Sequence, residues 1–224
     1  MWLTVWVAMY SGVGRTGKLC IAKGRAMAVI DVRIDITGMT PLLMHSDRLA
    51  DPLLPESKAF KRVTSKRTKT DADYEDMARM EYLAGLYLDP DTGAVSIPGR
   101  NLMKCLIEGA RVTKSGPKVE RGCVIGADFP LGYSGPTDPE KLYADKNFVS
   151  RMTVKVGTAR TIRCRPIFRA WTLTATGIID EAVLSADELS DIARNAGSLV
   201  GLGDYRKGGG FGRFTATVTA TGVR

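Results

Sequence analysis

The sequence predicts an α+β protein with a ferredoxin-like β-α-β-β-α-β core, in which helices back an antiparallel sheet. Two segments that alternate apolar and polar residues, at 28–38 and 211–221, predict strands near the two ends of the chain. Two helical patterns, one after Pro98 and one after Ser185, lie between them. A basic hairpin at 151–169 separates these helices and is expected as an insertion.

Length and charge favour one basic domain. The 224 residues are enough for one large core, and no Pro- or Ser-rich linker divides them. We expect a domain over residues 27–224, with insertions at about 40–97 and 128–150, preceded by an extension over residues 1–26. The formal charge of +8 and the pI near 9.4 favour a polyanionic partner such as nucleic acid, because the basic residues cluster in the sequence.

The four cysteines, Cys20, Cys105, Cys123 and Cys164, lie far apart and form no CxxC pair. We therefore expect reduced, mostly buried thiols in a cytoplasmic protein. His45 is the single histidine, so neither a zinc site nor another metal or cofactor is expected. No apolar run reaches the length of a membrane span.

Residues 12–18 of the N-terminal extension, GVGRTGK, fit the spacing of a phosphate-binding P-loop. Leu19 stands where that loop needs a Ser or Thr for Mg²⁺, and the following segment contains Gly24 and is a poor helix. A nucleotide-hydrolysing protein built on this motif is therefore only an alternative. A regular pattern begins at Met27, so we expect residues 1–26 to be a start-site extension that is poorly packed or disordered.

The first strand, residues 28–38, is expected to be half buried. Its even-numbered positions from Ile30 to Ile36 are apolar, whereas the odd-numbered ones include Asp and Arg. Prolines then forbid regular structure over residues 39–55, although Leu42 to Met44 should be buried. His45 lies in this loop.

A basic insertion follows the first strand. Ser57–Thr70 contains six basic residues and no acid, which predicts a flexible, solvated arm. Phe60 and Val63 would instead anchor an arm that follows a nucleic-acid backbone, and this alternative stays open. We expect Asp71–Ala84 to form a helix that starts with acids, and Gly85–Pro98 a hairpin.

The first core helix is expected to begin at Pro98 and to bury Leu102 and Leu106. Val119–Ala127 is then expected to form a strand. Pro130–Asp145 contains several glycines and prolines, which predict a loop.

The segment from Lys146 to Ile179 contains seven basic residues and no acid. A turn at Gly157–Ala159 divides it into two strands, and in each strand basic residues alternate with apolar ones. We therefore expect a hairpin with one basic and one apolar face. Because no acid in the segment neutralises the basic face, we expect it to contact phosphates.

The segment Gly197–Phe214, GSLVGLGDYRKGGGFGRF, links the second helix to the last strand. Its glycines allow positive φ angles and a close approach of the backbone to a ligand, while Arg206, Lys207 and Arg213 add positive charge. We expect this glycine loop to lie on the phosphates of a bound strand. A mobile hairpin loop is the alternative.

Three features give the chain a resemblance to the RAMP superfamily, the repeat-associated proteins that form backbone and crRNA-processing subunits of CRISPR effector complexes in antiviral defence. They are the opening strand running into ITGMTPLLMHS (36–46), the glycine loop GLGDYRKGGGFGRF (201–214), and the large basic insertion between the first strand and the first core helix. The chain is most similar to the backbone subunits, over most of residues 28–223. The resemblance implies an RRM-like core that grips a single strand through its backbone, polymerises head to tail along it, and interrupts base stacking with a thumb-like hairpin.

We therefore expect the protein to bind single-stranded RNA, such as a crRNA, or single-stranded DNA, with little sequence specificity and without catalysis. It should form a homo-oligomer or filament, alone or with other effector-complex subunits, or serve a phage or plasmid as a single-strand binding or annealing protein. The aromatics placed to stack on bases are Tyr205, Phe211, Phe60 and Tyr133. The residues expected to bind the strand are Lys58, Lys61, Arg62, Lys66, Arg67, Lys69, Arg100, Lys104, Arg151, Lys155, Arg163, Arg165, Arg169, Gly201, Gly203, Tyr205, Arg206, Lys207, Phe211 and Arg213.

Two other functions remain open at this point. An endoribonuclease of the same fold, with or without a metal, would use His45, Asp47 or Asp51 as its acid or base, since an acid in this loop cuts RNA in some members of the superfamily. A phage or plasmid structural protein would instead turn its basic face towards an acidic partner protein.

Overall fold

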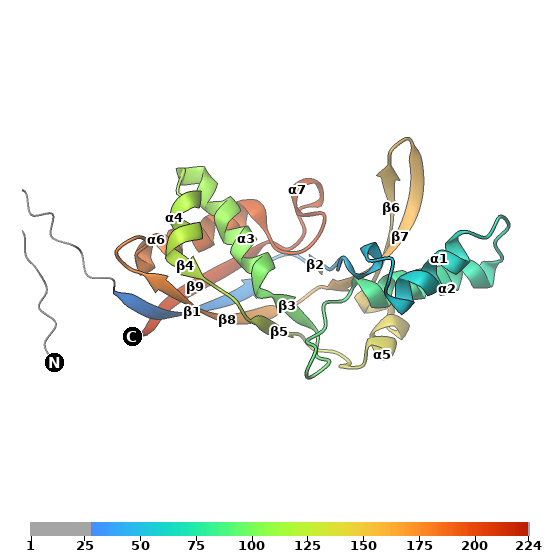
Figure 1. Ribbon diagram of the computed structural model, residues 1–224, viewed down its shortest axis with the longest axis horizontal. Coiled ribbons are helices and arrows are strands. Elements are labelled where there is room, and N and C mark those ends of the chain that lie inside the picture. Colours follow the sequence, from blue (N-terminus) through green and yellow to red (C-terminus); the bar gives the residue numbers. More distant parts are fainter. Residues whose placement is uncertain (1–27, 224) are drawn as a thin grey trace, which may run out of the picture.

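The computed structural model describes residues 28–223 and has the predicted α+β class, with antiparallel sheets and helices (Figure 1). The expectations for residues 1–26, which include the motif Gly12–Lys18 and Cys20, lie outside the described residues. Within residues 28–223, no helix has the length and apolarity that a membrane crossing requires.

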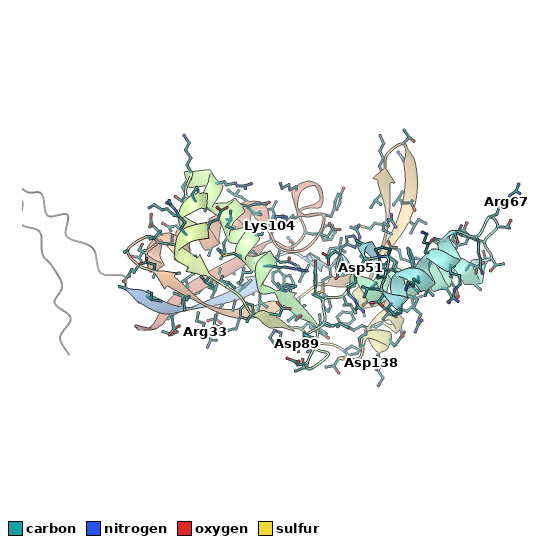
Figure 2. The ribbon with its side chains drawn as sticks, in the orientation of Figure 1. Arg33, Asp51, Arg67, Asp89, Lys104 and Asp138 are labelled. Atoms are coloured by element: carbon teal, nitrogen blue, oxygen red, sulfur yellow. The ribbon has the colours of Figure 1, made fainter. Side chains whose placement is uncertain are left out.

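The larger sheet is organised around β1 (Val29–Gly38). This strand lies between β8 (Thr172–Asp180) and β9 (Phe214–Val223) and is antiparallel to both. The alternation predicted for the first strand is confirmed, since the even-numbered positions 30–36 are at most 5% exposed. Arg33 lies on the opposite face and points into solvent (Figure 2).

Helices cover the apolar face of this sheet (Figure 1). They are α3 (Gly99–Ala110), α4 (Gly116–Gly122) and α6 (Ala186–Asn195). The helix predicted after Pro98 buries its apolar positions as expected. The capping box predicted at Ser185 is also confirmed, because its side chain and that of Glu188 each accept a hydrogen bond from the other residue's backbone N–H.

The strand expected over Val119–Ala127 is mostly wrong. Its first part belongs to α4, which has Pro117 in its first turn, a position that favours helix initiation. Only Cys123–Val124 is extended, as β4, and it pairs with one end of β8.

The loop expected over Pro130–Asp145 also contains regular structure. β5 (Asp128–Gly132) pairs with the other end of β8, and β3 (Ser96–Pro98) pairs with β5 at the edge of the sheet. α5 (Pro139–Ala144) forms because the Asp138 carboxylate accepts hydrogen bonds from its first amides.

A second, three-stranded sheet has the order β2 (Leu42–Leu43), β7 (Ala159–Phe168), β6 (Val149–Val156). The predicted hairpin with a turn at residues 157–159 is therefore confirmed as β6–β7. The side chains of Leu42 and Leu43 are fully buried, as expected, together with Met44.

The basic insertion is helical, which corrects the flexible arm expected over Ser57–Thr70. α1 (Pro55–Thr64) starts at a proline and packs against the neighbouring helix, and its Phe60 and Val63 are half-buried. That neighbour, α2 (Asp71–Gly85), is the predicted helix. The two helices form a hairpin that projects from the sheets (Figure 1).

The remaining elements are short. The hairpin expected over Gly85–Pro98 has a turn closed by a hydrogen bond from Gly93 N to Asp89 O, and a single bridge between Leu88 and Val95. Cys105, Cys123 and Cys164 are free and buried, as predicted. The other short segments are the 3₁₀ turns Arg48–Ala50, Arg111–Thr113 and Lys146–Phe148, the π-helical turn Ala196–Val200, and α7 (Arg206–Gly209).

Candidate nucleic-acid interface

The glycine loop is folded back on the protein and held by its backbone. Gly201 and Gly203 have φ angles of 82° and 77°, so the expected positive φ is confirmed. A Cβ at Gly203 would collide with the carbonyl oxygen of Leu43, while the next amide, Asp204 N, donates to the same oxygen over 2.8 Å. Only glycine allows this approach between the two segments. The loop is therefore fixed against β2.

Two of the three cations expected to bind phosphate also brace the loop. The Arg206 guanidinium lies 3.3 Å from a Glu108 carboxylate oxygen on α3 and 3.4 Å from Gly201 O. Arg213 donates to Arg206 O over 3.4 Å. Lys207, by contrast, is exposed and has no ion pair within residues 28–223. Of the three, Lys207 is the cation most available to a ligand.

The β6–β7 hairpin does not have the single basic face that the sequence predicts. Directly paired residues share a face of an antiparallel hairpin, and here Met152 pairs with Arg163, whereas Arg151 pairs with Cys164. Arg151 and Lys155 therefore lie on one face, and Arg163 lies on the other. The period of each strand is as predicted, but the register places basic and apolar residues on both faces.

Acids from other elements neutralise Arg163 and Arg165, two of the three arginines of β7. The Glu81 carboxylate on α2 accepts hydrogen bonds from Arg163 Nη1 over 3.0 Å and from Cys164 N over 2.9 Å. Arg165 forms an ion pair with Asp204 of the glycine loop. The second pair joins the hairpin to the loop, so both arginines fix the arrangement of these elements.

Two concave regions meet between the glycine loop and the hairpin, and we call them together the central groove. One, of about 390 Å³, is lined by α3 and the glycine loop; the other, of about 940 Å³, is lined by α1 and the hairpin. His45, Asp204 and Tyr205 line both. In Figure 1, α7 and the hairpin rise from the same side of the molecule, on either side of this region.

The central groove carries positive charge that is not neutralised within the described residues. Lys104 and Lys207 line its α3 side, and Lys155 and Arg160 line its hairpin side. All four side chains are exposed, and none forms an ion pair within residues 28–223. Figure 2 shows Lys104 on α3. We call these four residues the cation quartet.

His45 lies where the two parts of the groove meet. Desolvation in the groove lowers the pKa of its imidazole, as does the charge of Arg165, whereas Asp204 and Glu81 act in the opposite direction. The lowered pKa favours the neutral imidazole at pH 7. Tyr87, which donates a hydrogen bond to His45 O over 2.9 Å, lines the same side of the groove.

Three of the four aromatics expected to stack on bases are placed near the groove. Tyr205 is 51% exposed, and its ring centroid lies 6.1 Å from that of Phe211. Phe60 lines the hairpin side of the groove. Tyr133 does not fit this role, because its ring packs on Phe148 and Phe168.

Several predicted strand-binding residues lie outside the lining of the central groove. Arg67 marks the distal end of the α1–α2 hairpin (Figure 2). Arg100 lies 3.6 Å from Asp47. Asp51, which the sequence suggests as an acid or base for cleavage, also lies outside the lining, and its carboxylate accepts a hydrogen bond from Leu53 N. The others outside this lining are Lys58, Lys61, Arg62, Lys66, Lys69, Arg151, Arg169, Gly201, Phe211 and Arg213.

The groove also contains residues that the sequence did not single out. Tyr87 and Asn101 line it beside Lys104, and Glu81 lines it beside Arg163. Glu81 lies in the acid-rich helix α2, and Asn101 lies between the predicted strand-binding residues Arg100 and Lys104. Only the contact between distant segments brings them to the site.

No protein-family model matches the sequence, and no curated protein matches it. The fold is similar to that of a chain in the cryo-EM structure of the type III-B Cmr-beta bound to cognate target RNA, with a TM-score of 0.50 and 14% sequence identity. The similarity covers 86% of this chain and 61% of that chain. At this identity the likeness concerns the fold.

Proposed function

We propose that the protein binds single-stranded nucleic acid along the central groove and has no catalytic role. The observation that carries the proposal is the cation quartet, which places unneutralised charge on both sides of one groove. Phosphates of a strand would lie between the glycine loop and the hairpin and release their counterions. Gly208 of the glycine loop lines the groove, and its lack of a side chain would allow a phosphate to approach the backbone.

The order and pairing of the strands support this proposal. We assign β1, α3, β4, β8, α6 and β9 to the RRM-like β-α-β-β-α-β core. The strand order β4-β8-β1-β9, with antiparallel neighbours throughout, agrees with this assignment. The α1–α2 and β6–β7 hairpins are then insertions that build one side of the groove.

The structural similarity also supports a biological setting for this binding, an RNA-containing effector complex. Its likeness to a chain of an RNA-bound type III-B complex supports membership of the RAMP superfamily and RNA as the natural strand. In this setting, copies of the protein assemble head to tail along a crRNA, with other effector subunits, in the cytoplasm. Binding of single-stranded DNA in a phage or plasmid context is the alternative.

Fluorescence anisotropy with a labelled random-sequence oligonucleotide tests the proposal. Replacing the cation quartet by glutamine should weaken binding and reduce the slope of log affinity against log salt by about 3, since each phosphate contact to a single strand contributes about 0.7. A control that replaces Arg121 on α4 and Lys141 on α5, which lie outside the groove, removes two positive charges and should change the slope little. Wild-type protein that does not bind at low salt would contradict the proposal.

Cleavage of RNA is the second candidate function. It is favoured by the position of His45, which lines the groove and could act there as a base. A neutral imidazole in the groove can accept a proton. Asp47 and Asp51 are less suitable, because neither lines the groove. Labelled RNA that stays intact under saturating binding, with and without divalent metal, would exclude cleavage. Cleavage that the His45→Gln variant abolishes would replace the non-catalytic assignment.

A further inference from the structure

A third concave region, which we call the outer chamber, lies between the α1–α2 hairpin and β6–β7. Its volume is about 340 Å³, within the range of small-molecule pockets. Phe60, Tyr74 and Met77 line it from the helices, and Arg151 and Ile162 line it from the strands. The chamber thus has apolar and aromatic walls with positive charge beside them.

The outer chamber continues the central groove. Phe60, Glu81, Arg160 and Arg163 line both regions. A strand in the groove would therefore reach the chamber at the point where Phe60 of α1 lies beside β7. No separate entry path has to be assumed.

Two large apolar side chains of the chamber are exposed although the surrounding segments are folded. Tyr74 is 54% exposed and Ile162 is 62% exposed. Ile162 belongs to the alternating pattern of β7, and the sequence places it with the buried Cys164 and Phe168. Within the described residues, no element covers the two exposed side chains. An apolar ligand group between them would remove this surface from water.

The charges of the chamber suit a nucleotide. The guanidinium groups of Arg151 and Arg160 form no ion pair or hydrogen bond within residues 28–223 and are free for phosphate oxygens. The acid that lines the chamber, Glu81, already accepts hydrogen bonds from Arg163 and Cys164. The chamber therefore offers one aromatic face, one aliphatic face and two free cations.

We propose that the outer chamber binds one unstacked nucleotide of the strand that occupies the central groove. Its base lies between Tyr74 and Ile162, and its phosphates contact Arg151 and Arg160. Stacking on an aromatic side chain suits any base, because every base has a π face. This inference rests on the proposed function and assigns a binding role to the α1–α2 insertion.

Photocrosslinking tests the position of the base. A uridine oligonucleotide carrying 5-iodouracil is bound to the full-length protein and irradiated, and the crosslinked peptide is identified by mass spectrometry. We expect crosslinks to Tyr74 or Phe60. Efficient crosslinks that occur only at Tyr205 or Phe211 would contradict binding of a base in the outer chamber, but they would agree with strand binding in the central groove.

Variants test the energetic role of Tyr74. Tyr74→Ala should weaken binding about tenfold, whereas Tyr74→Phe should retain wild-type affinity, because stacking needs the ring and not the hydroxyl. The matched control is Leu199→Ala, an exposed apolar residue of the π-helical turn, and its affinity should not change. Wild-type affinity in Tyr74→Ala would overturn the inference. If the wild-type protein does not bind the strand at all, the proposed function itself fails.

Discussion

Glu81 shows how a single buried carboxylate joins two elements. Its side chain is 11% exposed, and it extends from α2 to an arginine side chain and a backbone amide of β7. Without the Glu81 carboxylate, the backbone amide of Cys164 would lose its hydrogen bond to that side chain. The charge of Glu81 therefore stabilises the attachment of the β6–β7 hairpin to the helices.

Glu81→Gln should destabilise the protein by roughly 1–3 kcal/mol, since a charge-assisted hydrogen bond to a partly buried arginine is lost. Urea denaturation measures this change. The matched control is Asp35→Asn, which breaks the Arg33–Asp35 pair on the exposed face of β1 and should change stability much less, because water screens the pair. Equal effects of the two substitutions would show that burial does not strengthen the Glu81 interactions.

His45 should make strand binding depend on pH. The pKa of its imidazole is below the usual value in the free protein, and phosphates in the groove would raise it, so binding takes up a proton. Affinity should rise as the pH falls from 7.5 to 5.5, by at most about tenfold per pH unit for one proton. For folding, protonation favours the unfolded state, so stability should fall as the pH drops through the usual value near 6.5.

Anisotropy titrations at several pH values check the effect on binding. His45→Gln should flatten the dependence between pH 7.5 and 5.5, because His45 is the single histidine and exposed carboxylates titrate below this window. A dependence that survives the substitution would assign the proton to another group.

The β6–β7 hairpin shows which properties of an element the sequence determines. Alternation along each strand predicted both strands and the turn between them, because the period of a strand depends on neighbouring residues. The pairing of Met152 with Arg163 depends on the turn and on contacts with other segments. The acids that neutralise Arg163 and Arg165 come from residues 81 and 204, so an acid-free segment does not make an unneutralised surface.

The glycine loop was the most predictable part of the site. Positive φ at Gly201 and Gly203 follows from the glycine content, whereas the bracing roles of Arg206 and Arg213 depend on contacts that the sequence does not show. Arginine can bind phosphate or close a loop, and its local sequence is similar in both cases.

Gly203→Val should displace the glycine loop, because the new side chain would meet Leu43 O and require a positive φ. We expect a stability loss of at least about 2 kcal/mol and weaker strand binding. The matched control is Gly210→Ala, where φ is also positive but a Cβ would meet no atom within 4 Å; it should cost about 1–2 kcal/mol. Thermal unfolding and anisotropy measure both effects, and equal losses would refute the close contact.

At the scale of the whole molecule, the positive charge is divided between two regions. The sequence suggested one surface, because basic clusters occur at residues 57–70, 146–169 and 206–213. In the fold, the second and third clusters meet at the central groove, whereas the first extends along α1 to the distal end marked by Arg67 (Figure 2). Clustering in sequence predicted a polyanion partner, but the helical hairpin carries part of the charge away from the groove.

Because the basic residues lie in two regions, two matched pairs of cations should contribute differently to the salt dependence of strand binding. Lys104→Gln with Lys207→Gln, in the groove, should reduce the slope of log affinity against log salt by about 1.4. Arg67→Gln with Lys69→Gln, at the connection between α1 and α2, should reduce it by less than about 0.5. Lys69 already donates a hydrogen bond to Lys66 O over 2.8 Å, and Lys66 pairs with Asp73, so these lysines stabilise the connection. Salt titrations of both double variants measure the slopes, and equal reductions would mean that the strand extends along the α1–α2 hairpin.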